Sequence, residues 1–153
     1  MTPTLIIGIG HPDRGDDAVG RVVAARLRAH VAVRVDVLET DGEAAKLLDL
    51  FEGRDNVIIV DAGLSGGKPG TIHRLNAVAA PLPRPMFAMS SHAIGLVESI
   101  ELARTLGTLP RRCLVFAIEA ERFTLGEGLS GEVAAAAESV VGRVLAELSR
   151  ELA

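Results

Sequence analysis

The sequence has few aromatic residues and a single cysteine. Aromatic residues make up 3% of the 153 residues, with no Trp or Tyr, and Cys113 is the one cysteine. A lone cysteine excludes an intramolecular disulfide and a cysteine-based metal cluster, so we expect Cys113 to serve packing. Hydrophobic residues still make up 48% of the chain. The sequence therefore predicts a folded protein whose core consists mainly of aliphatic side chains.

The chain also lacks clustered positive charge and long apolar runs. The formal net charge is −4, and no block of Lys or Arg stands out. Binding to nucleic acid needs clustered cations that contact phosphates, so this pattern argues against a nucleic-acid partner. No apolar run is long enough to span a bilayer, and no basic segment of a secretory signal precedes the first apolar run. We expect a cytoplasmic protein with neither nucleic acid nor a membrane as its partner.

Apolar segments of two kinds alternate along the chain. Short apolar runs predict strands, and longer segments repeat apolar residues at helical spacing. This alternation is typical of an α/β fold. We predict a single domain, residues 1–153, with an about five-stranded, mostly parallel twisted sheet and helices on both faces. The expected strands are 4–10, 33–39, 57–60, 71–75 and 114–118, and the expected helices are 17–30, 43–51, 92–106 and 132–152.

A glycine-rich loop follows the first predicted strand. Gly10, Pro12 and Gly15 end the strand, and Asp16 and Asp17 come directly before an apolar-periodic helix. A carboxylate at this place can cap the helix and lies favourably at its positive end. Two adjacent acids are more than a cap requires, which favours a functional role for Asp17. For Asp16, a cap or a loop-fixing hydrogen bond and a direct role both remain open.

Further polar residues follow the other predicted strands, where open α/β sheets bind ligands. Asp41 follows the second strand, Asp61 the third and Glu119 the last. His92 begins a predicted helix, where the macrodipole favours the neutral imidazole. Carboxylates and a neutral imidazole suit a borderline divalent cation such as zinc or nickel. Each residue also has a structural explanation, since Asp at a strand end or before Gly42 often starts a turn.

Several common enzyme motifs are absent. Gly8 and Gly10 after a strand suggest a dinucleotide fingerprint, but the position of the third glycine is occupied by Asp13. The phosphate-binding P-loop, the serine nucleophile elbow and the helix motif with two histidines do not occur.

The segment 7–20, Ile-Gly-Ile-Gly-His-Pro-Asp-Arg-Gly-Asp-Asp-Ala-Val-Gly, resembles the N-terminal signature of the hydrogenase maturation endopeptidases. The resemblance continues in the same order through nearly the whole chain, at 41–42, 57–62, 69–71, 91–96, 118–119, 123, 126 and 129–130. Members of that family remove a C-terminal peptide from the precursor of the nickel–iron hydrogenase large subunit. The resemblance implies that this chain is a peptidase with that precursor as its partner.

The resemblance also implies a set of site residues. By position, Asp17, Asp61 and His92 would bind the metal, which in the family is the nickel already installed in the substrate; zinc or cadmium could substitute for it. Two roles for the metal remain open: activation of a water, or positioning of the substrate while a carboxylate such as Asp16 acts as the base. Asp16 and Asp17 are therefore the candidate catalytic residues. The candidate substrate-binding residues are His11, Asp41 and Gly42.

The sequence departs from the family pattern at three positions. His11 stands where Asn is common, Ala18 replaces a frequent Gly, and Glu43 stands where a second Gly often follows Asp-Gly. Three alternatives remain: a non-enzymatic recognition module for nickel or the metal-loaded precursor, a related peptidase for another metalloprotein, and a hydrolase like peptidyl-tRNA hydrolase. The last needs a catalytic His soon after the first loop and a basic face for tRNA, and neither is found here.

Overall fold

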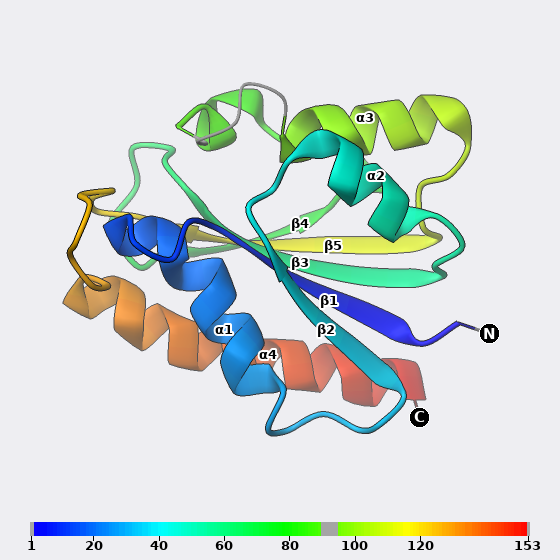
Figure 1. Cartoon of the computed structure of the whole chain (residues 1–153), viewed down its shortest axis with the longest axis horizontal. Helices are drawn as coiled ribbons and strands as arrows, with labels where there is room; N and C mark the ends of the chain where they lie inside the picture. The colour runs from blue at the N-terminus through cyan, green and yellow to red at the C-terminus, as the bar shows by residue number, and fades with distance from the viewer. Residues whose placement is uncertain (1, 90–94, 153) are drawn as a thin grey trace.

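The computed structural model describes residues 2–89 and 95–152, which form a central sheet with helices on both sides (Figure 1). The sheet has five strands in the order β2-β1-β3-β5-β4. β1, β2, β3 and β5 are parallel to one another, and β4 pairs with β5 in the antiparallel direction. The predicted fold class is confirmed. The strands are β1 Thr4–Ile9, β2 Val35–Thr40, β3 Asn56–Gly63, β4 Ile72–Asn76 and β5 Arg112–Glu119.

Two helices cover each face of the sheet (Figure 1). One face packs against α2 and α3, with Leu47, Phe51 and Ile100 in its core. The other packs against α1 and α4, with Val23 and Val140 in its core. The helices are α1 Val19–Leu27, α2 Ala44–Phe51, α3 Leu96–Leu106 and α4 Gly131–Leu152, with 3-10 turns η1 at Gly15–Ala18 and η2 at Arg84–Phe87. No helix in the described ranges has the length and apolar character needed to cross a membrane.

The central strands are apolar because both of their faces are buried. Leu5 and Ile7 of β1 face one core, and Ile6 faces the other. A strand between two layers of helices therefore shows a continuous apolar run instead of an alternation. Cys113 of β5 is buried, as expected for a packing residue, and burial raises the pKa of its thiol to about 12.

The structure corrects three predicted boundaries. β3 continues to Gly63 because its last residues pair with β5, so Asp61 lies within the strand and not after it. The helix predicted at 17–30 is a 3-10 turn followed by α1, which ends at Leu27. β2 begins at Val35, and Val33 is fully exposed before it. The predicted helix start at His92 lies outside the described residues, and α3 is described from Leu96.

Contact between backbones places η1 at the carboxyl end of the sheet. Gly8 of β1 faces the backbone of Gly20 in α1, where a Cβ on Gly8 would overlap the carbonyl oxygen of Gly20. The absence of both side chains lets α1 lie directly on the strands. This packing brings Asp17, two residues before α1, to the ends of β1 and β3.

Candidate functional site

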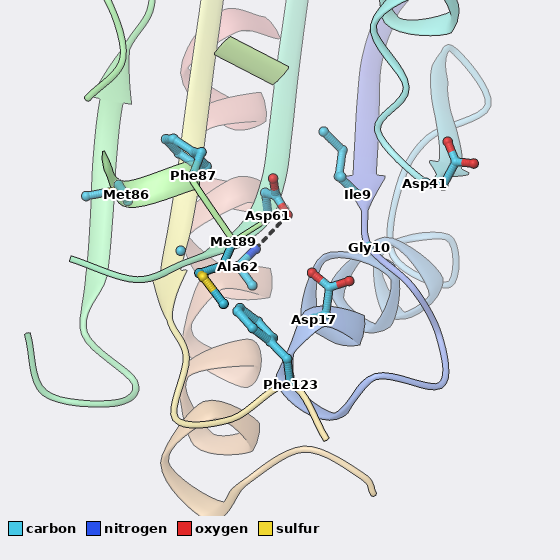
Figure 2. A pocket seen from close by; sticks show the side chains of 11 residues that line it. Ile9, Gly10, Asp17, Asp41, Asp61, Ala62, Met86, Phe87, Met89 and Phe123 are labelled. Atoms are coloured by element: carbon cyan, nitrogen blue, oxygen red, sulfur yellow. Dashed lines mark hydrogen bonds between the residues drawn. The ribbon is translucent and has the colours of Figure 1, made fainter. Parts of the chain in front are cut away.

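A narrow hollow opens where β1 and β3 end (Figure 2). Its acidic lining consists of Asp17 from η1, Asp61 from β3 and Asp41 from the loop after β2. Figure 2 shows the carboxylates of Asp17 and Asp61 on either side of the same space, whereas Asp41 lies farther to the side. The remaining lining is apolar apart from backbone and comprises Ile9, Gly10, Ala62, Gly63, Met86, Phe87, Met89 and Phe123.

Asp61 is buried within β3. Its Oδ1 accepts the N–H of Ala62 at 2.8 Å. Burial raises the pKa of Asp61 well above its ordinary value, and the negative charge of Asp17 raises it further; the Ala62 hydrogen bond acts in the opposite direction. A carboxylate in this situation gains stability from a nearby cation or from a proton. The hollow therefore favours a bound positive charge.

Asp17 is anchored by the loop that precedes it. Its Oδ2 accepts the backbone N–H of His11 at 3.0 Å. A guanidinium nitrogen of Arg14 lies 3.8 Å from the same oxygen, and the Arg14 group also lies over the ring of Phe123, 5.6 Å from its centroid. Asp17 is thus fixed at the edge of the hollow next to one cationic side chain.

The expected substrate-binding residues, His11, Asp41 and Gly42, lie at the side of the hollow. His11 contributes its backbone to Asp17, and its Nδ1 accepts the N–H of Asp13 at 3.1 Å. Asp41 accepts the N–H of Glu43 at 3.2 Å in a turn that leads into α2. Gly42 in this turn has a φ of +92°, which a side chain would strain.

A second hollow of about 270 Å³ adjoins the first and shares Ile9, Asp61 and Phe87 with it. Gly42 and Leu96 also line it, and its rim carries the ion pair between Arg84 and Glu98, 2.7 Å apart. The lining of this second hollow is mixed, with apolar Ile9, Phe87 and Leu96 beside charged Asp61, Arg84 and Glu98. Asp61 therefore borders both hollows.

Asp16 is not among the residues that line either hollow. It is fully buried, and its carboxylate accepts hydrogen bonds from Glu121, Arg122 and Ser130. Of the two readings that the sequence leaves open for Asp16, this geometry favours the loop-fixing bond.

Glu119 has a similar structural environment. It is buried at the end of β5, where its carboxylate accepts hydrogen bonds from the backbone and hydroxyl of Ser65 and lies 3.1 Å from Nε2 of His73. Burial opposes the charged form, but the hydrogen bonds from Ser65 and His73 leave the pKa of Glu119 below its ordinary value. Glu119 therefore fixes the loop after β3 and is not part of the acidic lining.

The structure describes two of the three expected metal ligands. Asp17 and Asp61 lie in one hollow, but His92 lies outside the described residues. Within those residues, no group of three or more His, Cys, Asp or Glu side chains is arranged to bind a metal ion. Carboxylates in a buried hollow are ligands for a divalent cation, so the two residues present fit a metal and need a further ligand.

Sequence reasoning missed the apolar part of the lining. Met86, Phe87 and Met89 come from the segment around η2, which has three prolines and little periodicity in its sequence. The one available signal was Pro85, since proline is favoured in the first turn of a helix. Periodicity alone does not detect so short an element.

The model of the hydrogenase maturation protease family matches residues 21–147, and the chain belongs to this family. Among solved structures, the hydrogenase maturating endopeptidase HybD from Escherichia coli is 26% identical, with a TM-score of 0.83 over 98% of this chain and 94% of that one. The [NiFe] hydrogenase maturation protease HycI from Thermococcus kodakarensis KOD1 is 27% identical, with a TM-score of 0.69 over 94% of this chain and 90% of that one. The resemblance inferred from the sequence is confirmed.

A curated relative is the hydrogenase expression/formation protein HupD from Thiocapsa roseopersicina. It is 28% identical over 117 residues, which cover 75% of this chain. The match covers 53% of HupD, so the chain spans about half the length of this relative.

Proposed function

We propose that this chain is an endopeptidase that removes the C-terminal extension from the nickel-loaded precursor of a nickel–iron hydrogenase large subunit. The observation that carries the proposal is the meeting of Asp17 and Asp61 in one buried hollow, in a chain of the hydrogenase maturation protease family. HybD and HycI, which share the fold, are named as maturation peptidases.

The nickel in this proposal arrives with the substrate. Asp17 and Asp61 supply carboxylate oxygens to it, and His92 supplies an imidazole nitrogen. The raised pKa of Asp61, caused by burial and then by Asp17, supports this assignment because a divalent cation neutralises both carboxylates. The donor set of oxygen and imidazole nitrogen also suits zinc or cadmium as a substitute. The protein then distinguishes a loaded precursor from an empty one by charge.

The hydrolysis needs an ordered peptide and a water. With the precursor's nickel held by Asp17 and Asp61, the neighbouring peptide bond would lie at the edge of the first hollow. Asp41, Gly42 and His11 border this region and are the proposed substrate contacts. Attack by the water breaks the C–N bond and releases the extension as a peptide with a free amine, while the precursor retains the new carboxyl group.

We place this reaction in the cytoplasm. Cell fractionation followed by detection of the chain tests this placement, and its recovery with periplasmic proteins would contradict it.

The proposal is tested with purified chain and two forms of the precursor, nickel-loaded and nickel-free. Intact-mass measurement is expected to show loss of the C-terminal peptide from the loaded form alone. His92→Ala and Asp61→Asn should abolish processing. Glu147 is a buried carboxylate on α4 that does not line the hollow, so Glu147→Gln should retain processing.

Two other outcomes discriminate between the rival functions. Binding of the loaded precursor without release of a peptide would favour a recognition module. Normal mass of every large subunit after deletion of the gene in its source organism would reject the hydrogenase substrate.

A further inference from the structure

Two loops that are far apart in the sequence are joined beside the hollow. The first is residues 11–16, and the second is residues 121–130, which we call the capping loop. The N–H of Asp16 donates to the carbonyl of Arg122 at 3.0 Å, and the N–H of Gly126 donates to that of Asp13 at 2.9 Å. Arg14 and Leu125 form an isolated β-bridge. The backbones of the two loops are therefore paired over several residues.

The side chain of Asp16 holds both ends of the capping loop. Its Oδ2 accepts the N–H groups of Glu121 at 2.8 Å and Arg122 at 3.1 Å. Its Oδ1 accepts the N–H of Ser130 at 2.7 Å, and the Ser130 hydroxyl also donates to the carboxylate. Hydrogen bonds to a charged acceptor are roughly twice as strong as neutral ones. One buried carboxylate thus fixes where the capping loop begins and ends.

Apart from Asp16 and the backbone pairing with residues 13–16, the capping loop is largely exposed. Residues 121–129 are exposed except for Phe123 and Leu129, which are half-buried. Phe123 lines the first hollow, and Figure 2 shows it between Asp17 and Met89. Arg14 from the first loop lies over its ring. A change in the attachment of the capping loop therefore moves one wall of the hollow.

We propose that Asp16 is a positioning residue, which holds the capping loop so that Phe123 forms a wall of the substrate hollow and contributes to peptide binding. This inference rests on the proposed endopeptidase function. It opposes the alternative, left open by the sequence, that Asp16 acts as the catalytic base. A base must reach a water or the substrate, whereas Asp16 is fully buried, accepts from three residues and does not line the hollow.

Limited trypsin digestion tests the attachment without any measurement of activity. The bond between Arg122 and Phe123 lies in the capping loop, and Arg111, in the exposed turn before β5, provides an internal reference. In Asp16→Ala, we expect cleavage after Arg122 to accelerate about tenfold relative to cleavage after Arg111. This ratio corresponds to a free energy of local opening of the capping loop that is about 1.4 kcal/mol lower. Ser130→Ala removes only the hydroxyl donor and should give a smaller acceleration. Glu147→Gln should leave the ratio unchanged.

Steady-state kinetics with the nickel-loaded precursor test the positioning role. We expect Asp16→Asn to raise KM about tenfold while kcat and the shape of the pH profile stay near wild type. In a Phe123→Ala background, the same substitution should change KM no further, because both changes remove one wall. A loss of kcat of about a hundredfold with loss of one limb of the pH profile would restore Asp16 as the base. Additive effects with Phe123→Ala would reject action through that wall.

The two proposals fail in different ways. If the wild-type chain cleaves no precursor, the endopeptidase function fails while the trypsin result still reports on the capping loop. If the wild type is active and Asp16→Ala leaves cleavage after Arg122 unchanged, the positioning role of Asp16 fails alone. Ser130→Ala guards against a misfolded Asp16 variant, because it leaves the carboxylate and three backbone donors in place.

Discussion

A Cβ on Gly20 of α1 would overlap the carbonyl oxygen of Val60, the residue directly before Asp61. It would also overlap the carbonyl oxygen of Ile9 and lie 2.8 Å from the Ile9 nitrogen. These atoms belong to strand backbones, which cannot move aside for a Cβ as the end of a flexible side chain can. We predict that Gly20→Ala lowers the free energy of unfolding by about 1–3 kcal/mol, as other overpacked substitutions do. Urea denaturation checks this value.

Gly142→Ala is the matched control for this prediction. Gly142 is an exposed helix residue of α4, and a Cβ there would have nothing within 4 Å. Alanine should stabilise the helix by about 0.5–1 kcal/mol because it restricts the unfolded chain. Equal stability of the two variants would show that α1 does not depend on backbone contact with the sheet.

Asp61→Asn should stabilise the metal-free protein at neutral pH while it abolishes processing. The raised pKa of Asp61 means that the folded state binds a proton more tightly than the unfolded state. Its contribution to stability therefore becomes less favourable as the pH rises through this raised pKa. Asparagine keeps an acceptor for the N–H of Ala62 and removes the buried charge. For a chain of this size, each kcal/mol gained raises Tm by about 2–4 °C.

Thermal unfolding of wild type and Asp61→Asn from pH 5 to pH 8 provides the measurement. The advantage of the variant should grow with pH, because only the wild type then carries the buried charge. A variant less stable than the wild type across this range would indicate that a favourable interaction in the folded protein stabilises the negative charge of Asp61.

Glu147 should act in the opposite sense. It is buried on α4, and a hydrogen bond from Arg74, with the charges of Arg74, Arg150 and Arg112, lowers its pKa from 4.5 against the opposing effect of burial. The stabilisation is complete above the unfolded-state pKa and is lost as the pH falls through the lowered folded-state pKa. We predict that Glu147→Gln costs about 1–3 kcal/mol at pH 7 and less at pH 3. An equal cost at both values, measured by urea denaturation, would contradict an electrostatic origin.

Cys113 should be unreactive in the native protein. The buried thiol has a pKa of about 12, so almost no thiolate exists at neutral pH. We expect no alkylation by iodoacetamide at pH 7.5, and a single alkylation after addition of guanidinium chloride, when intact mass is measured. Rapid labelling of the native protein would mean that β5 opens readily.

The sequence predicted the sheet because burial leaves a direct signal in the order of residues. The short apolar runs of the sequence indicated the strands, and β1 and β3 are among those whose runs are buried. The predicted end of β3 was wrong because a polar residue suggests the end of a strand. Asp61 instead pairs with β5, and the pairing continues to Gly63. Hydrogen bonds to a neighbouring strand have no signal in the local pattern.

The site was predictable to a smaller degree. Asp17 and Asp61 were selected as acids near strand ends, and the structure places them in one hollow. Their joint use with His92 stays a prediction. The contacts of Asp16 depend on Ser130 and Arg122, more than a hundred positions away, and no local pattern reveals them. The contact of Glu147 with Arg74, which lies 73 positions away, likewise has no signal in the local sequence.

The hydrogen bond between Asp16 and Ser130 closes 114 positions of chain. Contacts over such a separation form late, since the entropy of a long loop must be overcome before they contribute. During synthesis, Ser130 is added 114 residues after Asp16. We therefore expect the wall formed by Phe123 to be completed late in folding. In a nascent chain, Asp17 and Asp61 are therefore synthesised well before Phe123, which completes the wall of their hollow.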